Sequence, residues 1–217
     1  MAPNPLSGTQ PQLAKRDDSR QARNDYQEPS RRNRVRVRFR LVVLLPDAQL
    51  SSAIRSAEKT GLHDYVFYRA ILLRYAYDVL GQRRRFVAPQ RYNVTSRCLY
   101  LSEKRSTCMK EIEAFAIPKD SFVIRSIHVE LNGVLDLTSP KTLNTFDLSE
   151  QDLSFDFRAH TTPSPTQRLG EACAASGLID GILFESIAAP GETNLVVLES
   201  NLASLGSDLQ AGRKRLP

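Results

Sequence analysis

The sequence predicts an α+β domain in which a compact mixed sheet is flanked by helices. Short apolar or alternating stretches, typical of strands, are interspersed with amphipathic segments typical of helices. The length of 217 residues, 41% of them hydrophobic and 25% charged, fits one domain with an extension. No apolar stretch reaches the ~20 residues of a membrane helix and no secretory signal is visible, so we expect a cytoplasmic protein with no membrane contact.

The positive charge is concentrated at one end of the chain. Residues 1–40 carry ten Lys and Arg against four acids, a surplus equal to the whole net charge of +6. Residues 1–33 also have almost no large apolar side chains, so we expect a disordered basic arm. The domain is expected over residues 34–202, and a flexible tail over residues 203–217.

The periodicity of the apolar residues assigns the elements in order. Strands are expected over residues 34–45, 66–72, 98–101, 121–131, 134–137, 181–184 and 194–198. Helices are expected over residues 48–60, ended by Gly61, over 102–116, and over 167–176, closed by Gly177. Residues 81–96 are irregular and basic, and residues 138–165 are rich in loops. Three separated cysteines and three histidines give no disulfide framework and no metal-ligand spacing, so no metal is expected.

Several polar residues stand out against this pattern. Arg69 lies in an otherwise apolar strand, where a buried guanidinium needs either a structural acid or a phosphate as its partner. Tyr100, between two leucines, fits a core tyrosine as well as a site residue. Glu111 and Glu113 flank the apolar stripe of their helix on opposite sides, and periodicity does not choose between them.

Two loops carry small or polar side chains next to strands. Arg91, Tyr92 and Asn93 form a polar and aromatic group in a segment expected to be irregular. Ser186 follows an apolar strand, and Asn194 opens the next strand after a Pro-Gly loop. Such strand ends offer hydroxyl, amide and backbone N–H groups to a phosphate or a ribose, although an ordinary loop has the same composition.

In their order and spacing, these segments resemble the RES domain family, most of whose members are toxins of bacterial Xre–RES toxin–antitoxin pairs. The resemblance runs from about Tyr65 to Leu198. Tyr68-Arg69 is similar to the opening Y-R element, and Arg91-Tyr92-Asn93 to an R-W-N element with tyrosine in place of tryptophan. Leu99-Tyr100-Leu101 resembles the tyrosine strand, and Glu111, eleven residues after Tyr100, falls where the family has its glutamate. Residues 178–186 and 194–198 resemble the serine strand and the N-L-V strand. Gln90 departs from the family's glycine before R-W-N, and the arm lies outside the resemblance.

The resemblance implies a fold similar to ADP-ribosyltransferase toxins, NAD+ as the substrate and an Xre-like antitoxin as the partner. It implies catalytic roles for Glu111, Arg69 and Tyr100. It also implies that NAD+ is bound by Arg69, Arg91, Tyr92, Asn93, Ser186 and Asn194. The chemistry would be hydrolysis or phosphorolysis of the nicotinamide–ribose bond, or transfer of ADP-ribose to a protein. Because nicotinamide leaves as a neutral group, one carboxylate suffices, whereas most glycosidases need two.

Two other classes of function remain open from the sequence. The arginine-rich arm could contact nucleic-acid phosphates in a protein without enzymatic activity, although residues 41–217 are charge-neutral and show no nucleic-acid-reading motif. Alternatively, the chain could be an inactive RES-like interaction module. The presence of Arg69, Tyr100, Glu111 and Ser186 argues against lost activity.

Overall fold

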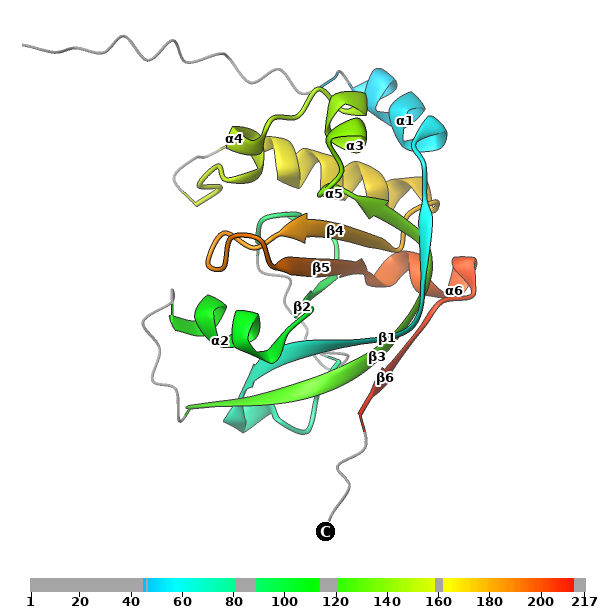
Figure 1. Ribbon diagram of the computed structural model, residues 1–217. Coiled ribbons are helices and arrows are strands. Elements are labelled where there is room, and N and C mark those ends of the chain that lie inside the picture. Colours follow the sequence, from blue (N-terminus) through cyan, green and yellow to red (C-terminus); the bar gives the residue numbers. More distant parts are fainter. Residues whose placement is uncertain (1–44, 46, 81–88, 114–120, 159–161, 213–217) are drawn as a thin grey trace, which may run out of the picture. The chain divides into compact units, whose positions relative to one another are not determined.

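Six strands form a mixed sheet that closes on itself (Figure 1). The computed structural model describes residues 45, 47–80, 89–113, 121–158 and 162–212. Its strands are β1 (Thr60–Leu72), β2 (Cys98–Ser102), β3 (Phe122–Asp136), β4 (Gly181–Glu185), β5 (Thr193–Leu198) and β6 (Asp208–Ala211). They run in the order β1-β2-β5-β4-β3-β6, and a further pairing of β1 with β3 closes a barrel. The predicted α+β class with a mixed sheet is confirmed.

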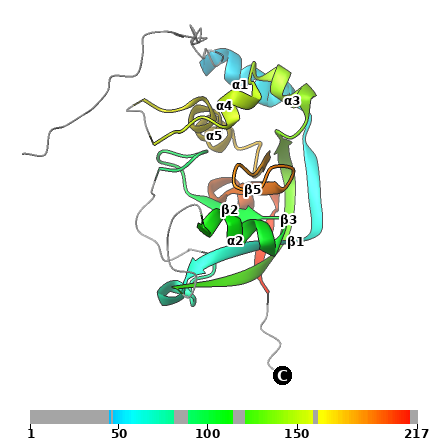
Figure 2. The same ribbon diagram turned by 60° about the vertical axis from the view of Figure 1, so that its left-hand side comes forward.

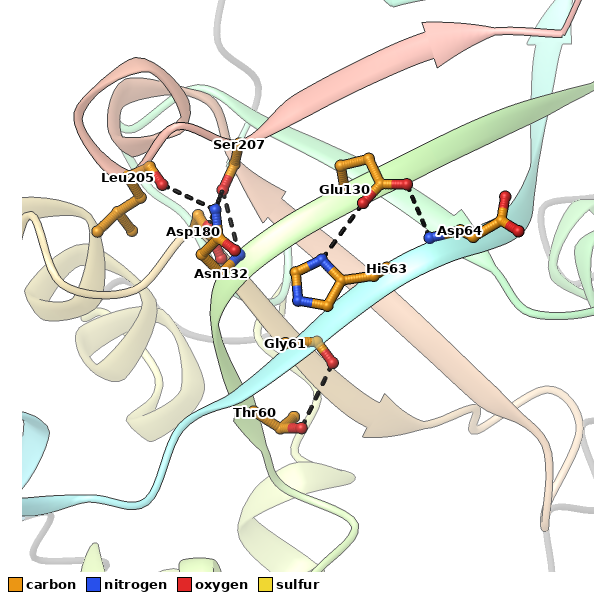
Figure 3. Close-up of polar contacts among 9 residues, drawn as sticks. All are labelled: Thr60, Gly61, His63, Asp64, Glu130, Asn132, Asp180, Leu205 and Ser207. Atoms are coloured by element: carbon orange, nitrogen blue, oxygen red, sulfur yellow. Dashed lines mark hydrogen bonds and ion pairs between the residues drawn. The ribbon is translucent and has the colours of Figure 1, made fainter.

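The longest pairing joins β1 to β3. Residues 65–72 pair in continuous antiparallel register with residues 122–129. The register shifts between Leu62 and Tyr65, where Asp64 takes a positive φ of 60°. The backbone N–H of Asp64 donates to the Glu130 carboxylate at 2.7 Å (Figure 3). This side chain supplies the acceptor for an N–H that lies at the break in regular strand pairing.

The separate strands predicted over residues 121–131 and 134–137 are one strand, β3. The connection at Asn132-Gly133 is held by the buried carboxylate of Asp180, which accepts both backbone N–H groups at 3.0 and 3.1 Å. Gly133 is required there, because a Cβ would lie 2.5 Å from the Leu178 carbonyl oxygen. The Asn-Gly pair at positions 132 and 133 is therefore an irregularity within one strand, held by the Asp180 side chain, and not the end of a strand.

Helices cover the sheet in two places (Figures 1 and 2). One group gathers beside β4 and consists of α1 (Asp47–Ser56), α3 (Pro140–Thr145), α4 (Glu150–Leu153) and α5 (Pro165–Ser176). The other is α2 (Arg105–Glu113), which packs on β1 and β2. The short helices η1 (Leu73–Tyr75), η3 (Glu199–Asn201) and α6 (Leu202–Leu205) lie between strands in the chain.

Two apolar cores lie on opposite sides of β5, as strand alternation requires. Val196 and Leu198 join the core beneath α1 and α5, while Leu195 and Val197 join the core between β5 and the β1–β3 pair. The sheet is therefore buried on both faces at this point. The continuous apolar run in β5 follows from that position.

The first helix ends earlier than predicted. It stops at Ser56, not at Thr60, and Gly61 lies inside β1 instead of closing the helix. The reason is tertiary: β3 extends to Asp136 and offers Val134 as a partner to Thr60. The prediction of α5 is confirmed, with Gly177 after it at a φ of 68°. Its start moves to Pro165, behind a capping box formed by Ser164 and Gln167.

The flexible tail predicted over residues 203–217 is wrong for residues 203–211. They contribute to α6 and form β6, which pairs antiparallel with β3 from Glu130↔Asp208 to Ile127↔Ala211. The Ser207 hydroxyl also donates to the Asp180 carboxylate, which attaches this segment to the Asn132-Gly133 connection (Figure 3). A paired strand and a buried carboxylate hold the part of the predicted tail from Ser207 to Ala211.

Most of the predicted arm and first strand, residues 1–44, lies outside the described residues, and so do residues 213–217. The expectations for these segments remain predictions. Within the described ranges, no helix is both long enough and apolar enough to cross a membrane.

Candidate active site

A cavity of about 410 Å³ opens where β1 and β2 separate. Within the described part of the chain, a single register pair, Tyr68↔Ser102, joins these two strands. Helix α2 packs against both of them. The polar lining comes from Tyr68, Gln90, Arg91, Tyr100, Ser102, Cys108, Glu111, Arg158 and Asn194, and the aromatic lining from Phe122, Phe157 and Phe184. The volume falls within the range of small-molecule sites.

The Glu111 carboxylate is held in place from two strand ends. The Ser186 hydroxyl donates to its Oε1 at 2.6 Å, and the Asn194 amide donates to the same oxygen at 2.8 Å. Glu111 is the one acidic residue among the described residues that line the cavity. Both of these hydrogen bonds fall on the same carboxylate oxygen, Oε1.

The Ser186 side chain forms hydrogen bonds both to the Glu111 carboxylate and within its own turn. Its side chain is 1% exposed, and besides donating to Glu111 its Oγ accepts the Ala189 backbone N–H at 3.1 Å. The backbone N–H of Ser186 donates to the Glu192 carbonyl oxygen, which closes the turn. Ser186 does not line the cavity. These contacts make it a positioning residue for Glu111.

Tyr100 connects β2 to the loop that carries Arg91. Its hydroxyl accepts the Tyr92 backbone N–H and donates to Asn93 Oδ1, both at 2.9 Å. Burial raises the pKa of Tyr100 well above its ordinary value, so the phenol stays protonated at neutral pH. Tyr100 therefore holds the loop as a neutral donor and acceptor, while its side chain faces the cavity.

Helix α5 holds the other side of the same loop. A Cβ on Gly170 would lie 1.8 Å from the Tyr92 carbonyl oxygen, so only glycine permits this approach. The next residue, Glu171, accepts five hydrogen bonds from the backbone N–H groups of residues 94–96 and the hydroxyls of Thr95 and Ser96. Burial opposes ionisation of Glu171, but the hydrogen bonds outweigh it and lower its pKa to about 2.

Two guanidinium groups meet one aromatic ring at the cavity wall. The Cζ atoms of Arg91 and Arg158 lie 5.8 and 5.2 Å from the centre of the Phe157 ring. Arg91 also donates through Nη1 to the Leu153 carbonyl oxygen. Burial lowers the pKa of Arg91, the negative charge of Glu111 opposes this shift, and the charge of Arg158 adds a smaller lowering effect.

Arg69 and Tyr92 do not line this cavity. Tyr68 and Ala70 do line it, so by strand alternation Arg69 faces the opposite side of β1. There it is 8% exposed and donates to the Val79 carbonyl oxygen at 2.6 Å. Tyr92 is fully buried, and its ring centre lies 4.7 Å from that of Phe184.

The structure therefore brings four of the predicted site residues to the cavity wall: Arg91, Tyr100, Glu111 and Asn194. Ser186 and Asn93 lie directly behind this wall, through their hydrogen bonds to Glu111 and Tyr100. Phe157, Arg158 and Glu171 were missed by the sequence analysis. The signal for the first two was an aromatic and charged group, Phe155 to Arg158, within an otherwise polar loop; Glu171 gave no signal, because acids are ordinary on helices.

The fold and the cavity define a class of protein: a closed mixed α+β barrel whose strands part around one oriented carboxylate and two guanidiniums. Residues 66–213 match the family model described as RES domain, and the chain belongs to that family. The match extends past Leu198 and includes β6.

The fold is also similar to that of a solved structure. A chain in the crystal structure of the M. tuberculosis MbcT–MbcA toxin–antitoxin complex superposes with a TM-score of 0.57 at 19% identity. The similarity covers 76% of this chain and 90% of that chain. A search of curated proteins found no match to this sequence.

Proposed function

We propose that this protein is the toxin of a toxin–antitoxin pair and that it cleaves the bond between nicotinamide and ribose in NAD+. The observation that carries the proposal is the Glu111 carboxylate, oriented by Ser186 and Asn194 on a cavity that also presents Arg91 and Arg158. Membership of the RES domain family and the similarity to a chain of a toxin–antitoxin complex support it. The partner would be an Xre-like antitoxin, and the site of action the cytoplasm.

The residues at the cavity suit the charge changes of this reaction. The nicotinamide ring of NAD+ is cationic and leaves as a neutral molecule, so no acid has to protonate it. Positive charge develops on the ribose instead, and a fixed carboxylate next to it stabilises the transition state. Among the described lining residues Glu111 has no second carboxylate beside it, which disfavours the two-carboxylate hydrolysis of ordinary glycosides.

Hydrogen bonds from Ser186 and Asn194 to Oε1 fix the carboxylate before the substrate arrives. The second oxygen, Oε2, then faces the ribose or orients the attacking nucleophile. Tyr100 is neutral and keeps Arg91 at the wall through the loop that it holds. Such preorganisation avoids the cost of moving dipoles during the reaction.

The test is incubation of the purified protein with NAD+, followed by measurement of released nicotinamide. Parallel reactions in plain buffer, with inorganic phosphate and with a candidate acceptor protein separate hydrolysis, phosphorolysis and ADP-ribose transfer. We expect release in at least one of them, and growth inhibition of a bacterial host by the same protein. Absence of nicotinamide release in all three, from protein with a cooperative thermal transition, would contradict the proposal.

A further inference from the structure

Helix α2 carries Glu111, and the hydrogen bonds described above hold the helix at one point, this carboxylate. Ser186 and Asn194 both bind the same oxygen of Glu111, near the C-terminal end of α2. The helix also packs on β1 and β2, and its residues Cys108 and Ile112 are buried. Apolar packing holds a helix against a sheet but is non-directional, so it does not by itself fix where the helix lies along the sheet. A second directional contact would fix the position of α2.

The turn between β4 and β5, orange in Figure 1, makes such a contact at the start of α2. Glu192 Oε2 accepts a hydrogen bond from the Lys104 ammonium at 2.7 Å and a longer one from the Thr107 hydroxyl at 3.5 Å. Thr107 is 1% exposed and lies four residues before Glu111, so both side chains are on the same face of the helix. The turn therefore holds α2 at two points that lie about 6 Å apart along the helix axis.

Glu192 is also bound to the residue that orients Glu111. Its carbonyl oxygen accepts the Ser186 backbone N–H at 2.8 Å, and its own N–H donates to the Ala189 carbonyl oxygen at 3.0 Å. The side chain of Glu192 thus reaches α2, while its backbone holds the turn that presents Ser186. The hydrogen bond between Glu192 and Lys104 lowers the pKa of the carboxyl and raises the pKa of the ammonium, so both groups are charged at neutral pH.

We propose that Glu192 is a positioning residue for Glu111, and that its ion pair with Lys104 fixes α2 against the turn between β4 and β5. This inference rests on the proposed function, because it names a residue that governs the placement of the proposed catalytic carboxylate. Glu192 does not line the cavity, so it acts on turnover and not on binding of the substrate. The ion pair is partly exposed, with side-chain exposures of 57% for Lys104 and 22% for Glu192, so its contribution to the free energy of unfolding is small.

The test uses Glu192→Gln, Lys104→Met and the protein with both substitutions. Arg105→Met is the matched control, because Arg105 is the exposed cation next to Lys104 and does not line the cavity. Lys104→Met and Arg105→Met remove the same charge from the same end of α2. Nicotinamide release gives kcat and KM. Amide hydrogen exchange over residues 105–113 measures how firmly α2 is held without any need for turnover, and thermal unfolding checks the fold of each variant.

We expect Glu192→Gln and Lys104→Met each to lower kcat about three- to tenfold with KM nearly unchanged, because a small displacement of the carboxylate affects the chemical step. The doubly substituted protein should be no slower than either single variant, because both changes break the same contact. Hydrogen exchange in α2 should become about two- to fivefold faster, as for the loss of a surface ion pair. Arg105→Met should match wild type in all of these measurements.

The two kinds of measurement separate this inference from the proposed function. If wild type releases no nicotinamide, the proposed function fails, whereas faster exchange in Glu192→Gln and Lys104→Met but not in Arg105→Met still supports the positioning of α2 by the ion pair. Wild-type exchange of α2 in both single variants would overturn the inference. In a protein that does release nicotinamide, an unchanged kcat, a change confined to KM, or losses that add up in the doubly substituted protein would overturn it as well.

Discussion

The two walls of the cavity are built in different ways. On the carboxylate wall, Glu111 is fixed by Ser186 and Asn194, which are 1% and 6% exposed and belong to or follow strands. On the cation wall, Arg158 is exposed on the segment after α4. Stabilising a developing charge requires a carboxylate placed to a fraction of an ångström, whereas a phosphate attracts a guanidinium over a longer range. Under the proposed function, the buried, hydrogen-bonded carboxylate wall suits catalysis, and the exposed guanidinium suits substrate binding.

The largest expected effect tests the carboxylate wall directly. Glu111→Gln should lower kcat for NAD+ cleavage about 100-fold or more, because the amide is isosteric but lacks the charge that stabilises the ribose cation. Nicotinamide release under saturating NAD+ measures it. Glu113→Gln, two positions along the same helix and absent from the cavity lining, is the matched control and should keep wild-type activity. Equal turnover of the Glu111 variant and wild type would remove Glu111 from the mechanism.

A smaller loss is expected when the carboxylate stays but loses an orienting contact. Ser186→Ala removes the donor at 2.6 Å from Glu111 and the acceptor for the Ala189 N–H. We expect kcat to fall about tenfold with little change in KM, the cost of about one hydrogen bond in the transition state. A rise in KM at constant kcat would instead place Ser186 among the substrate-binding residues, as the sequence analysis had it.

The loop that carries Arg91 allows a test through pH and stability. Glu171 has its pKa lowered to about 2 in the folded protein, so its ionised form stabilises the fold at pH values above its unfolded pKa of about 4.3. That contribution falls progressively as the pH drops from about 4 towards 2. Glu171→Gln cannot titrate, so its free energy of unfolding should be lower by about 1–2 kcal/mol at pH 7 and approach that of wild type near pH 2.

Urea unfolding of the two proteins at several pH values measures this difference. We expect kcat to change only a few-fold in Glu171→Gln, since Tyr100 still holds the loop from the other side. A stability difference that does not vary with pH would show that the five hydrogen bonds do not depend on the charge of Glu171.

The smallest effect is expected at Tyr92. Its hydroxyl is buried and, among the described residues, has no hydrogen-bond partner. Tyr92→Phe removes an unsatisfied polar group and keeps the ring against Phe184, so activity should be unchanged and the melting temperature equal or higher. Tyr100→Phe is the contrasting variant, because it deletes two hydrogen bonds to the Arg91 loop. A large loss of activity in Tyr92→Phe would mean that the hydroxyl contacts the substrate.

The sequence predicted best those strands that are surrounded by apolar side chains on both faces. β2, β4 and β5 were found because strands buried on both faces have apolar runs that need no knowledge of their partners. The end of α1 was misplaced because the pairing of Thr60 with Val134 joins residues 74 positions apart. The C-terminal strand β6 was missed because its polar residues are held by a partner strand, and the preceding Ser207 by Asp180.

The same difference between local patterns and long-range contacts explains which residues of the candidate site could be predicted. Glu111 was chosen from the spacing of family motifs, and the structure places it on the cavity with Ser186 and Asn194. The sequence did not reveal the direction in which Arg69 faces, since that depends on which side of β1 the cavity lies. It also gave no reason to connect Arg158 to Arg91, because the contact runs through the Phe157 ring.

The hydrogen bonds of Glu111 have a consequence for the protein during its synthesis. Ser186 and Asn194 follow Glu111 in the chain by 75 and 83 residues. They reach it only when β4 and β5 have been made and have inserted between β3 and β2. A chain still on the ribosome that has produced β1, β2, α2 and β3 therefore carries Glu111 without either orienting partner. The carboxylate is therefore oriented only in a chain that has been synthesised at least as far as Asn194.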